Sequence, residues 1–100
     1  MNTHPMKLVT MVVEALAKEP MITLLREVGA HGYTLFPVEG DGSRGKRPAD
    51  IPEFTNIQID VLVPSEVANH LLERLEREFF PRYAMIAFET EVRVLRQGKF

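Results

Sequence analysis

Alternating apolar and polar positions predict four β-strands along the chain. Lys7 to Val13 is apolar in both alternating sets, which is typical of a central strand covered on both faces. Tyr33 to Val38 carries Pro37 near its end, which favours an edge strand or a strand terminus. Thr55 to Val63 alternates strictly and so has one face on the core. Ala84 to Leu95 forms a long last strand.

Two further segments have the spacing of amphipathic helices. Pro20 suits a first helical position, and Gly29 ends the pattern. Between them apolar residues recur at i, i+3, i+4 and i+7, namely Met21, Leu24, Leu25 and Val28. A second helix opens after Pro64 with Ser65 as its N-cap, and Pro81 ends it. Its expected buried stripe comprises Val67, Ala68, Leu71, Leu72, Leu75 and Phe79.

The order strand, helix, strand, strand, helix, strand predicts an α+β fold, the ferredoxin-like βαββαβ sandwich. In this fold a four-stranded antiparallel sheet carries both helices on one face. One hundred residues form one domain, residues 1–100, with residues 1–6 expected as a flexible tail. We assign Leu62, Met85, Ala87 and Leu95 to the sheet face that the helices leave uncovered. An uncovered apolar face predicts self-association.

Residues 39–54 break every period and form a long loop, and loops of this length are usually functional in a small domain. Glycines at 40, 42 and 45 occur there with Arg44, Lys46 and Arg47. Glycines let backbone N–H groups turn toward an anion, and arginine binds phosphate in a bidentate manner. The residues fit a phosphate cradle, but they match no nucleotide-binding signature. From these residues alone, a solvated hairpin is at least an equal alternative.

Composition narrows the function mainly by exclusion. The formal net charge of −2 argues against broad nucleic-acid binding. The absence of cysteine excludes disulfides, zinc-thiolate sites and thiol catalysis. His4, His31 and His70 have no spacing that suits a metal site. The apolar run from Leu8 to Val13 is too short to span a membrane or to act as a secretory signal, so we expect the cytoplasm.

Three sequence stretches resemble PII-like signalling proteins. They are VGAHGYT at residues 28–34, GDGSR at residues 40–44 followed by Arg47, and EFFPRYA at residues 78–84. The similarity runs from about Lys7 to Lys99. It is greatest to the subgroup linked to inorganic carbon, which comprises the bicarbonate-transporter regulators and the carboxysome-associated PII proteins.

The resemblance implies a homotrimer that binds adenine nucleotides in clefts between subunits. Residues 39–54 would be the T-loop, which changes conformation with ligand and contacts a target protein. Tyr33 and Thr34 would lie beside the nucleotide. The phosphates would be held by Gly42, Ser43, Arg44 and Arg47 of one subunit and by Arg96 of its neighbour. The adenine pocket would be lined by the strand backbone at Ile86, Ala87, Phe88 and Glu89.

Departures from the nitrogen-sensing members refine this expectation. Those members carry a glycine-rich loop after the second helix that grips a triphosphate, whereas residues 82–85 contain no glycine. ADP and AMP are therefore favoured over ATP. The resemblance to the carboxysome-associated proteins implies bicarbonate as a second ligand, and no cofactor is expected to be required. Residues 39–54 contain no tyrosine, so uridylylation of the loop is not expected. A bicarbonate transporter or a carboxysome component is the expected target protein.

The leading hypothesis is a non-enzymatic sensor in inorganic-carbon metabolism. The alternative is an acylphosphatase-like enzyme on the same fold. That enzyme needs an arginine in a phosphate-cradling loop after the first strand, and Glu14 to Glu19 offers neither arginine nor glycine. An RNA-recognition module needs exposed aromatic residues on central strands, and Thr55 to Val63 has none.

Overall fold

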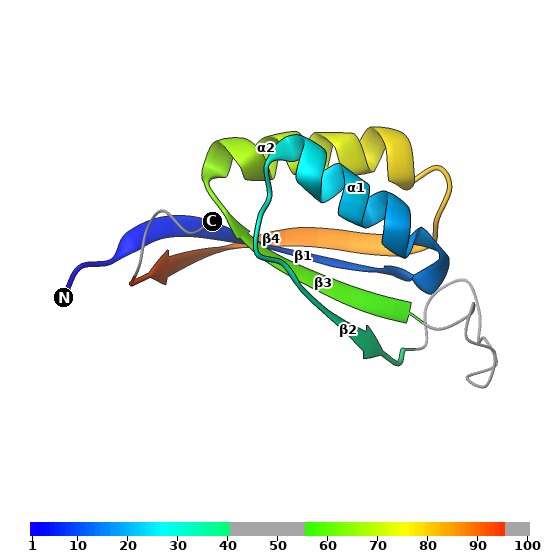
Figure 1. Ribbon diagram of the computed structural model, residues 1–100, viewed down its shortest axis with the longest axis horizontal. Coiled ribbons are helices and arrows are strands. Elements are labelled where there is room, and N and C mark those ends of the chain that lie inside the picture. Colours follow the sequence, from blue (N-terminus) through cyan, green and yellow to red (C-terminus); the bar gives the residue numbers. More distant parts are fainter. Residues whose placement is uncertain (41–55, 96–100) are drawn as a thin grey trace.

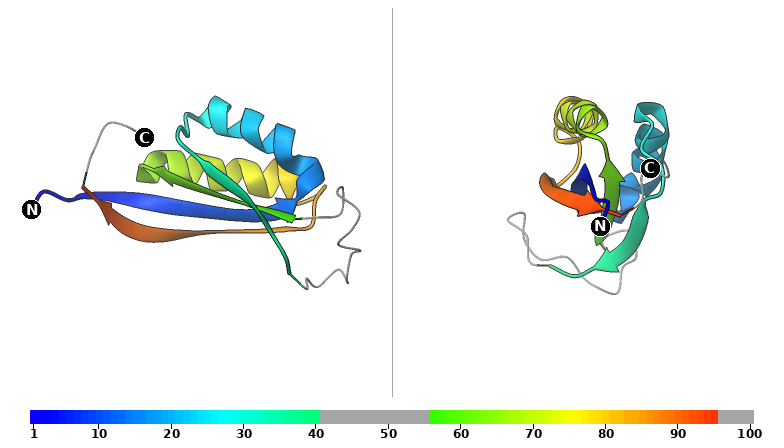
Figure 2. Two further views of the ribbon diagram at one scale, coloured as in Figure 1. Left: turned by 60° about the horizontal axis from the view of Figure 1, so that its bottom comes forward. Right: turned by 90° about the vertical axis from the view of Figure 1, so that its left-hand side faces the viewer.

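The computed structural model describes residues 1–40 and 56–95, and it confirms the ferredoxin-like order. The strands are β1 (His4–Glu14), β2 (Thr34–Val38), β3 (Asn56–Val63) and β4 (Met85–Val94). The helices are α1 (Lys18–Val28) and α2 (Ser65–Arg74), with a 3-10 turn η1 (Ala15–Ala17) before α1 and a π-helical turn η3 (Leu75–Phe79) after α2. The sheet is antiparallel in the order β2-β3-β1-β4, and both helices cover one face of it (Figures 1 and 2).

Strand β1 is central, as its two apolar faces predict. It pairs with β3 from Lys7 to Glu14 and with β4 from His4 to Val13. Its first residues were expected to be a flexible tail, but this is wrong for residues 4–6. His4 pairs with Val94, Met6 pairs with Val92, and Met6 is buried. The ladder extends this far because β4 is long enough to supply partners for residues that precede the apolar run.

The core lies between the sheet and the helices. The odd-numbered residues of β1 from position 9 and of β3 project into it, including Met11 and Ile59, which pair directly. The predicted apolar set of α1 is fully confirmed, since all four of its members are buried. The α2 stripe is confirmed at Ala68, Leu71, Leu75 and Phe79, whereas Val67 and Leu72 are only partly buried.

The opposite face of the sheet, which we call the open face, carries no helix (Figure 2). Residues that pair directly across antiparallel strands project to the same side. Val12 pairs with Ile86, and Thr10 pairs with Phe88. Ile86 is 58% exposed and Phe88 is 48% exposed. These two β4 side chains therefore give the open face its largest apolar exposure at this edge.

The assignment of Met85 and Ala87 to the open face is wrong. They pair with Val13 and Met11, which are fully buried beneath the helices, and they pack against the core themselves. Near the start of β4 both alternating sets of residues are apolar, so its sequence does not show which set faces the helices. The expectation placed the two faces of the strand the wrong way round. Leu62 was assigned correctly, because it pairs with Leu8 on the open face.

The start and end of α1 follow the sequence signals closely. The helix begins two residues before Pro20, which is tolerated because first-turn N–H groups have no partner within the helix. Gly29 ends it in the left-handed conformation at φ 80°. The N–H of Gly29 donates to the carbonyl of Arg26 (3.2 Å), and that of Ala30 donates to Leu25 (2.8 Å). This is the glycine-terminated helix end that the pattern predicts.

Ser65 is not the N-cap of α2. Pro64 occupies the cap position in an extended conformation, and its carbonyl accepts the N–H of Ala68 at 3.0 Å. Ser65 is instead the first helical residue, because the fixed backbone of proline supplies the turn into the helix. At the other end the N–H of Phe80 donates to Leu75 (2.9 Å), which widens the last turn into η3.

Candidate functional site

The described site residues lie at the two opposite edges of the sheet. Thr34 begins β2 at one edge, and residues 86–89 lie in β4 at the other. A single row crosses the sheet from Thr34 through Asp60 and Thr10 to Phe88. Three strand spacings of roughly 4.8 Å separate Thr34 from Phe88 by about 14 Å. One chain therefore does not bring the two halves of the expected site together.

The β4 half of the site combines an exposed apolar face with an open strand edge. Ile86 and Phe88 project to the open face, whereas Ala87 packs against the core. Glu89 lies on the helix side, where one carboxylate oxygen is 3.6 Å from Nζ of Lys7. Among the strands of the described ranges, β4 pairs only with β1. Its outer backbone groups are thus placed to bind a base or another chain.

The β2 half follows a turn in which two glycines have positive φ. Gly29 ends α1, and Gly32 (φ 71°) precedes Tyr33 and Thr34. A Cβ at Gly32 would meet no atom within 4 Å, so the backbone conformation rather than space favours glycine there. Tyr33 is 39% exposed and Thr34 is exposed. Both side chains are therefore accessible at the start of an edge strand.

Five of the predicted site residues fall outside the described part of the chain. They are Gly42, Ser43, Arg44, Arg47 and Arg96. The described neighbours show where the expected T-loop is attached. Val38 pairs with Asn56, and Asn56 pairs with Glu14 at the end of β1. The loop is attached to the sheet at the end where β1 leaves it and β4 enters.

The backbone N–H groups of the connection between η3 and β4 form hydrogen bonds within the subunit. The N–H groups of Arg82 and Tyr83 both donate to the carbonyl of Phe79, each at 2.9 Å. The next N–H, that of Ala84, donates to a carboxylate oxygen of Glu14 at 2.9 Å. The rings of Phe79 and Tyr83 also pack, with centroids 5.7 Å apart. Three consecutive backbone donors are therefore used inside the subunit.

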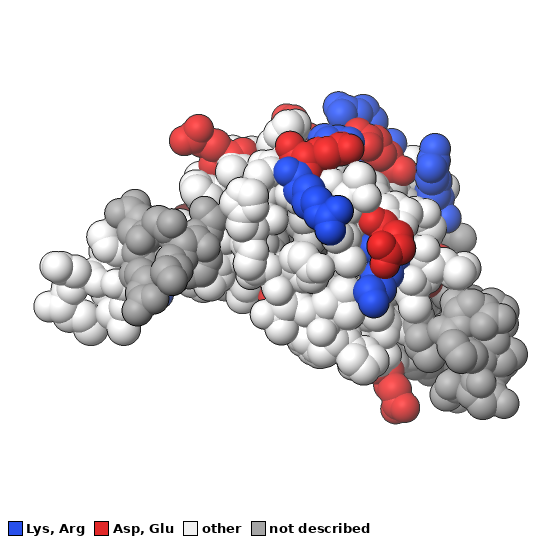
Figure 3. Space-filling view, viewed as in Figure 1, with Lys and Arg blue, Asp and Glu red and all other residues white. Residues whose placement is uncertain are grey.

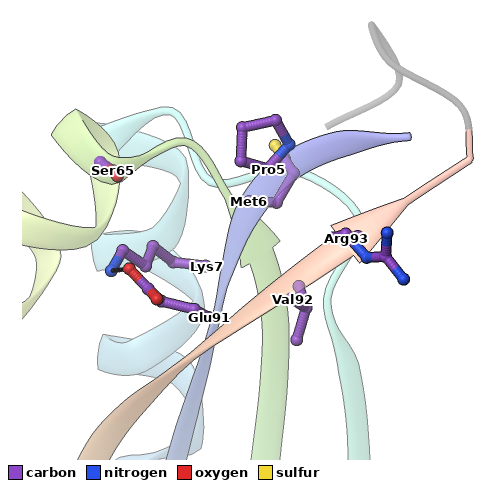
Figure 4. Close-up of a pocket in the computed structure, with 7 residues that line it drawn as sticks. All are labelled: Pro5, Met6, Lys7, Ser65, Glu91, Val92 and Arg93. Atoms are coloured by element: carbon purple, nitrogen blue, oxygen red, sulfur yellow. Dashed lines mark hydrogen bonds and ion pairs between the residues drawn. The ribbon is translucent and has the colours of Figure 1, made fainter. Parts of the chain in front are cut away.

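A shallow cavity of about 400 Å³ lies where β1 and β4 pass the start of α2 (Figure 4). Lys7 donates a hydrogen bond to Glu91 across it, with Nζ and Oε1 3.1 Å apart. That bond, together with the charges of Glu91 and Glu89, raises the pKa of Lys7 above its ordinary value. Because two carboxylates already pair with this lysine, Lys7 is a poor ligand for an anion in the cavity.

A second group of charges joins the two helices. The guanidinium of Arg74 donates to both carboxylate oxygens of Glu78, each at 2.9 Å. It also lies 2.8 Å from a carboxylate oxygen of Glu27 on α1. The bond from Arg74 is the main cause that lowers the pKa of Glu78 to about 2. Figure 3 shows charged side chains of both signs gathered over this helical layer.

Neither Glu14 nor the Arg74 group was singled out from the sequence. The i, i+4 spacing of Arg74 and Glu78 is a usable signal, but the bonds to Glu27 and Ala84 join distant segments. Across residues 1–40 and 56–95, no three metal-ligating side chains cluster. Within the same ranges, no helix combines the length and the apolar character needed to cross a membrane.

Comparison with known proteins covers almost the whole chain. Residues 6–99 match the family of the nitrogen regulatory protein P-II. A PII-like signalling protein of Thermus thermophilus is 44% identical, covers 94% of this chain and 93% of its own, and superposes with a TM-score of 0.82. CPII of Thiomonas intermedia, a PII-like protein solved with ADP, AMP and bicarbonate, is 28% identical over 94% of this chain and 99% of its own, with a TM-score of 0.81.

A second structure of CPII, bound to ADP and bicarbonate, has a TM-score of 0.85 at 29% identity and covers 95% of this chain and 93% of its own. These similarities confirm the resemblance inferred from residues 28–34, 40–44 and 78–84, and they favour the regulatory hypothesis over the acylphosphatase-like one. The bicarbonate bound in the CPII structures also agrees with the inorganic-carbon subgroup. The chain belongs to the family of the nitrogen regulatory protein P-II.

Proposed function

We propose that this protein is a non-enzymatic cytoplasmic regulator of inorganic-carbon metabolism. It binds ADP or AMP in preference to ATP, with bicarbonate as a second ligand, and signals through the conformation of the T-loop, residues 39–54. The observation that carries this proposal is the similarity to CPII, which has been solved with ADP, AMP and bicarbonate. That similarity extends over nearly all of this chain.

The functional unit that we propose is a homotrimer. Two observations support it, since the site residues lie at opposite edges of the sheet and the open face exposes Ile86 and Phe88. A neighbouring copy that covers the open face buries these side chains, which is favourable by roughly 25 cal/mol per Å² of apolar surface. The same copy supplies the second half of each nucleotide site.

Each half of the site has a distinct chemical task. One subunit supplies Tyr33 and Thr34 beside the nucleotide, and its T-loop holds the phosphates. Its phosphate ligands are Gly42, Ser43, Arg44 and Arg47. The neighbouring subunit lines the adenine pocket with residues 86–89 and reaches the phosphates with Arg96. Arginine suits this task because its fork of N–H donors binds phosphate oxygens in pairs.

The signal is a change in the population of loop conformations. A ligand that contacts the base of the T-loop in one conformation shifts the equilibrium toward it by its difference in affinity. A target protein then binds that conformation. A bicarbonate transporter or a carboxysome component is the target class that we propose, and nucleic acid is not a partner.

Isothermal titration calorimetry with ADP, AMP and ATP, each with and without bicarbonate, tests the proposal. We expect ADP and AMP to bind more tightly than ATP. Arg44→Ala should weaken ADP binding by about 10-fold or more, as expected for loss of a charged hydrogen bond. Arg26→Ala, which removes an exposed arginine of α1, is the matched control. Absence of heat with all three nucleotides would overturn the proposal.

A further inference from the structure

Glu14 occupies a junction of three parts of the fold. It is the last residue of β1 and pairs with Asn56, the first described residue after the expected T-loop. Its carboxylate accepts the N–H of Ala84, the residue directly before β4. One side chain therefore links the end of β1 to the start of β4 at the base of the T-loop.

With this hydrogen bond, three consecutive backbone N–H groups have acceptors inside the subunit. The N–H groups of Arg82, Tyr83 and Ala84 all donate to acceptors inside the subunit. Backbone N–H groups in glycine-rich loops bind phosphates because they are free to turn outward. The connection from η3 to β4 has no glycine, and its described donors are directed inward. As it stands, it offers no backbone donor to a phosphate.

The connection also lies close to the proposed adenine segment. Ala84 precedes Ile86 by two residues, a separation of about 7 Å in an extended chain. A nucleotide whose base lies against residues 86–89 thus has this connection, and the carboxylate that holds it, within reach of its polyphosphate.

We infer that Glu14 is a positioning residue for nucleotide selectivity. By holding the N–H of Ala84, it fixes the connection from η3 to β4 in a closed form that offers a third phosphate no backbone donor. This inference rests on the proposed function, because it concerns the same nucleotide site. It deepens that proposal by naming a residue that selects a nucleoside mono- or diphosphate over a triphosphate.

The test compares Glu14→Ala and Glu14→Gln with the wild type, with Glu73→Gln as the control on the exposed surface of α2. The Kd values for ADP and ATP are measured by calorimetry, and hydrogen exchange of the Ala84 amide is followed by NMR. In Glu14→Ala we expect faster exchange at Ala84 and a fall of about 3- to 10-fold in the ratio of the ATP Kd to the ADP Kd, which is the effect of about one hydrogen bond. Glu14→Gln keeps an acceptor oxygen but loses the charge, so we expect a smaller change in the same direction.

An unchanged Kd ratio in Glu14→Ala overturns the inference, even if exchange at Ala84 becomes faster. If Glu14→Ala does not fold, Glu14→Gln decides by the same two readouts, and an unchanged ratio again overturns it. A wild-type protein that binds none of ADP, AMP and ATP refutes the proposed function itself. A wild type that binds ADP, with no change of ratio in the variants, refutes only the role of Glu14.

Discussion

Thr34 and Phe88 lie in one row across the sheet, yet at its opposite edges. Asp60 and Thr10 stand between them, so the two residues are about 14 Å apart within a chain. If both contribute to one nucleotide site, that site takes Thr34 from one copy of the chain and Phe88 from another. Ligand binding at such a site therefore depends on the assembly of at least two copies of the chain.

Mixed oligomers test this division directly. Arg44→Ala removes a predicted phosphate ligand from one half of the site, and Arg96→Ala removes one from the other half. Each variant alone should bind ADP weakly. When the two are co-expressed and assemble at random, about a quarter of the clefts should regain both arginines, because each cleft combines two chains. Calorimetry of the mixture, compared with the separate variants, measures the recovery. If all site residues came from one chain, no cleft would recover.

Placing a charge on the open face should dissociate the oligomer. Phe88→Lys puts an ammonium group where a large apolar side chain is 48% exposed in the single chain and is expected to be covered by a neighbour. Light scattering after size-exclusion chromatography should give the mass of one chain for this variant and of three chains for the wild type. Leu16→Lys is the matched control, since Leu16 is an apolar residue on η1 with 60% exposure. A trimeric Phe88→Lys protein would contradict the placement of the interface on the open face.

Replacing Gly29 should destabilise the fold through the backbone alone. A Cβ at this position meets nothing within 4 Å, but φ is 80°, a conformation that costs an L-residue about 1 to 2 kcal/mol. Urea denaturation of Gly29→Ala should show a loss of this size in the free energy of unfolding. Gly40→Ala also has open space and no positive φ, so it should change stability by less than about 0.5 kcal/mol. Equal effects of the two substitutions would exclude the conformational explanation.

The bond between Arg74 and Glu78 should make stability depend on pH in the acid range. The pKa of Glu78 is lowered in the folded chain from 4.5 to about 2. The stabilisation by Glu78 is therefore fully present above pH 4.5 and is lost as the pH falls toward about 2. Glu78→Gln should be less stable than the wild type near neutral pH, and the difference should shrink through this range. Glu73→Gln, an exposed change in the adjoining α2, should show no such convergence.

The sequence predicts the layers of the fold well, because the spacing of apolar residues differs clearly between its strands and its helices. The helix stripes and the strict alternation of β3 each leave only one face that can be buried. The start of β4 is different, since Met85, Ile86, Ala87 and Phe88 are all apolar. Only the register with β1 decides that Met85 and Ala87 face the helices. The pattern of one strand does not contain that information.

The candidate site was predictable to a smaller degree. Tyr33, Thr34 and residues 86–89 were expected from resemblance, and the structure places them at opposite edges without testing their roles. Glu14 was missed because its bond to Ala84 joins residues 70 positions apart, and no local pattern signals such a pair. The roles of Arg44 and Arg96 stay predictions, since both lie outside the described residues.

Pro37 lies in β2, at the edge of the sheet opposite β4. Proline has no N–H, so this edge is interrupted as a template for an incoming strand. Ladder growth through β2, which would propagate from chain to chain into a fibre, is thereby discouraged. Contact through the open face stays available, and in the proposed homotrimer such contact closes on itself at three copies. A single imino acid thus helps to separate finite assembly from open-ended aggregation.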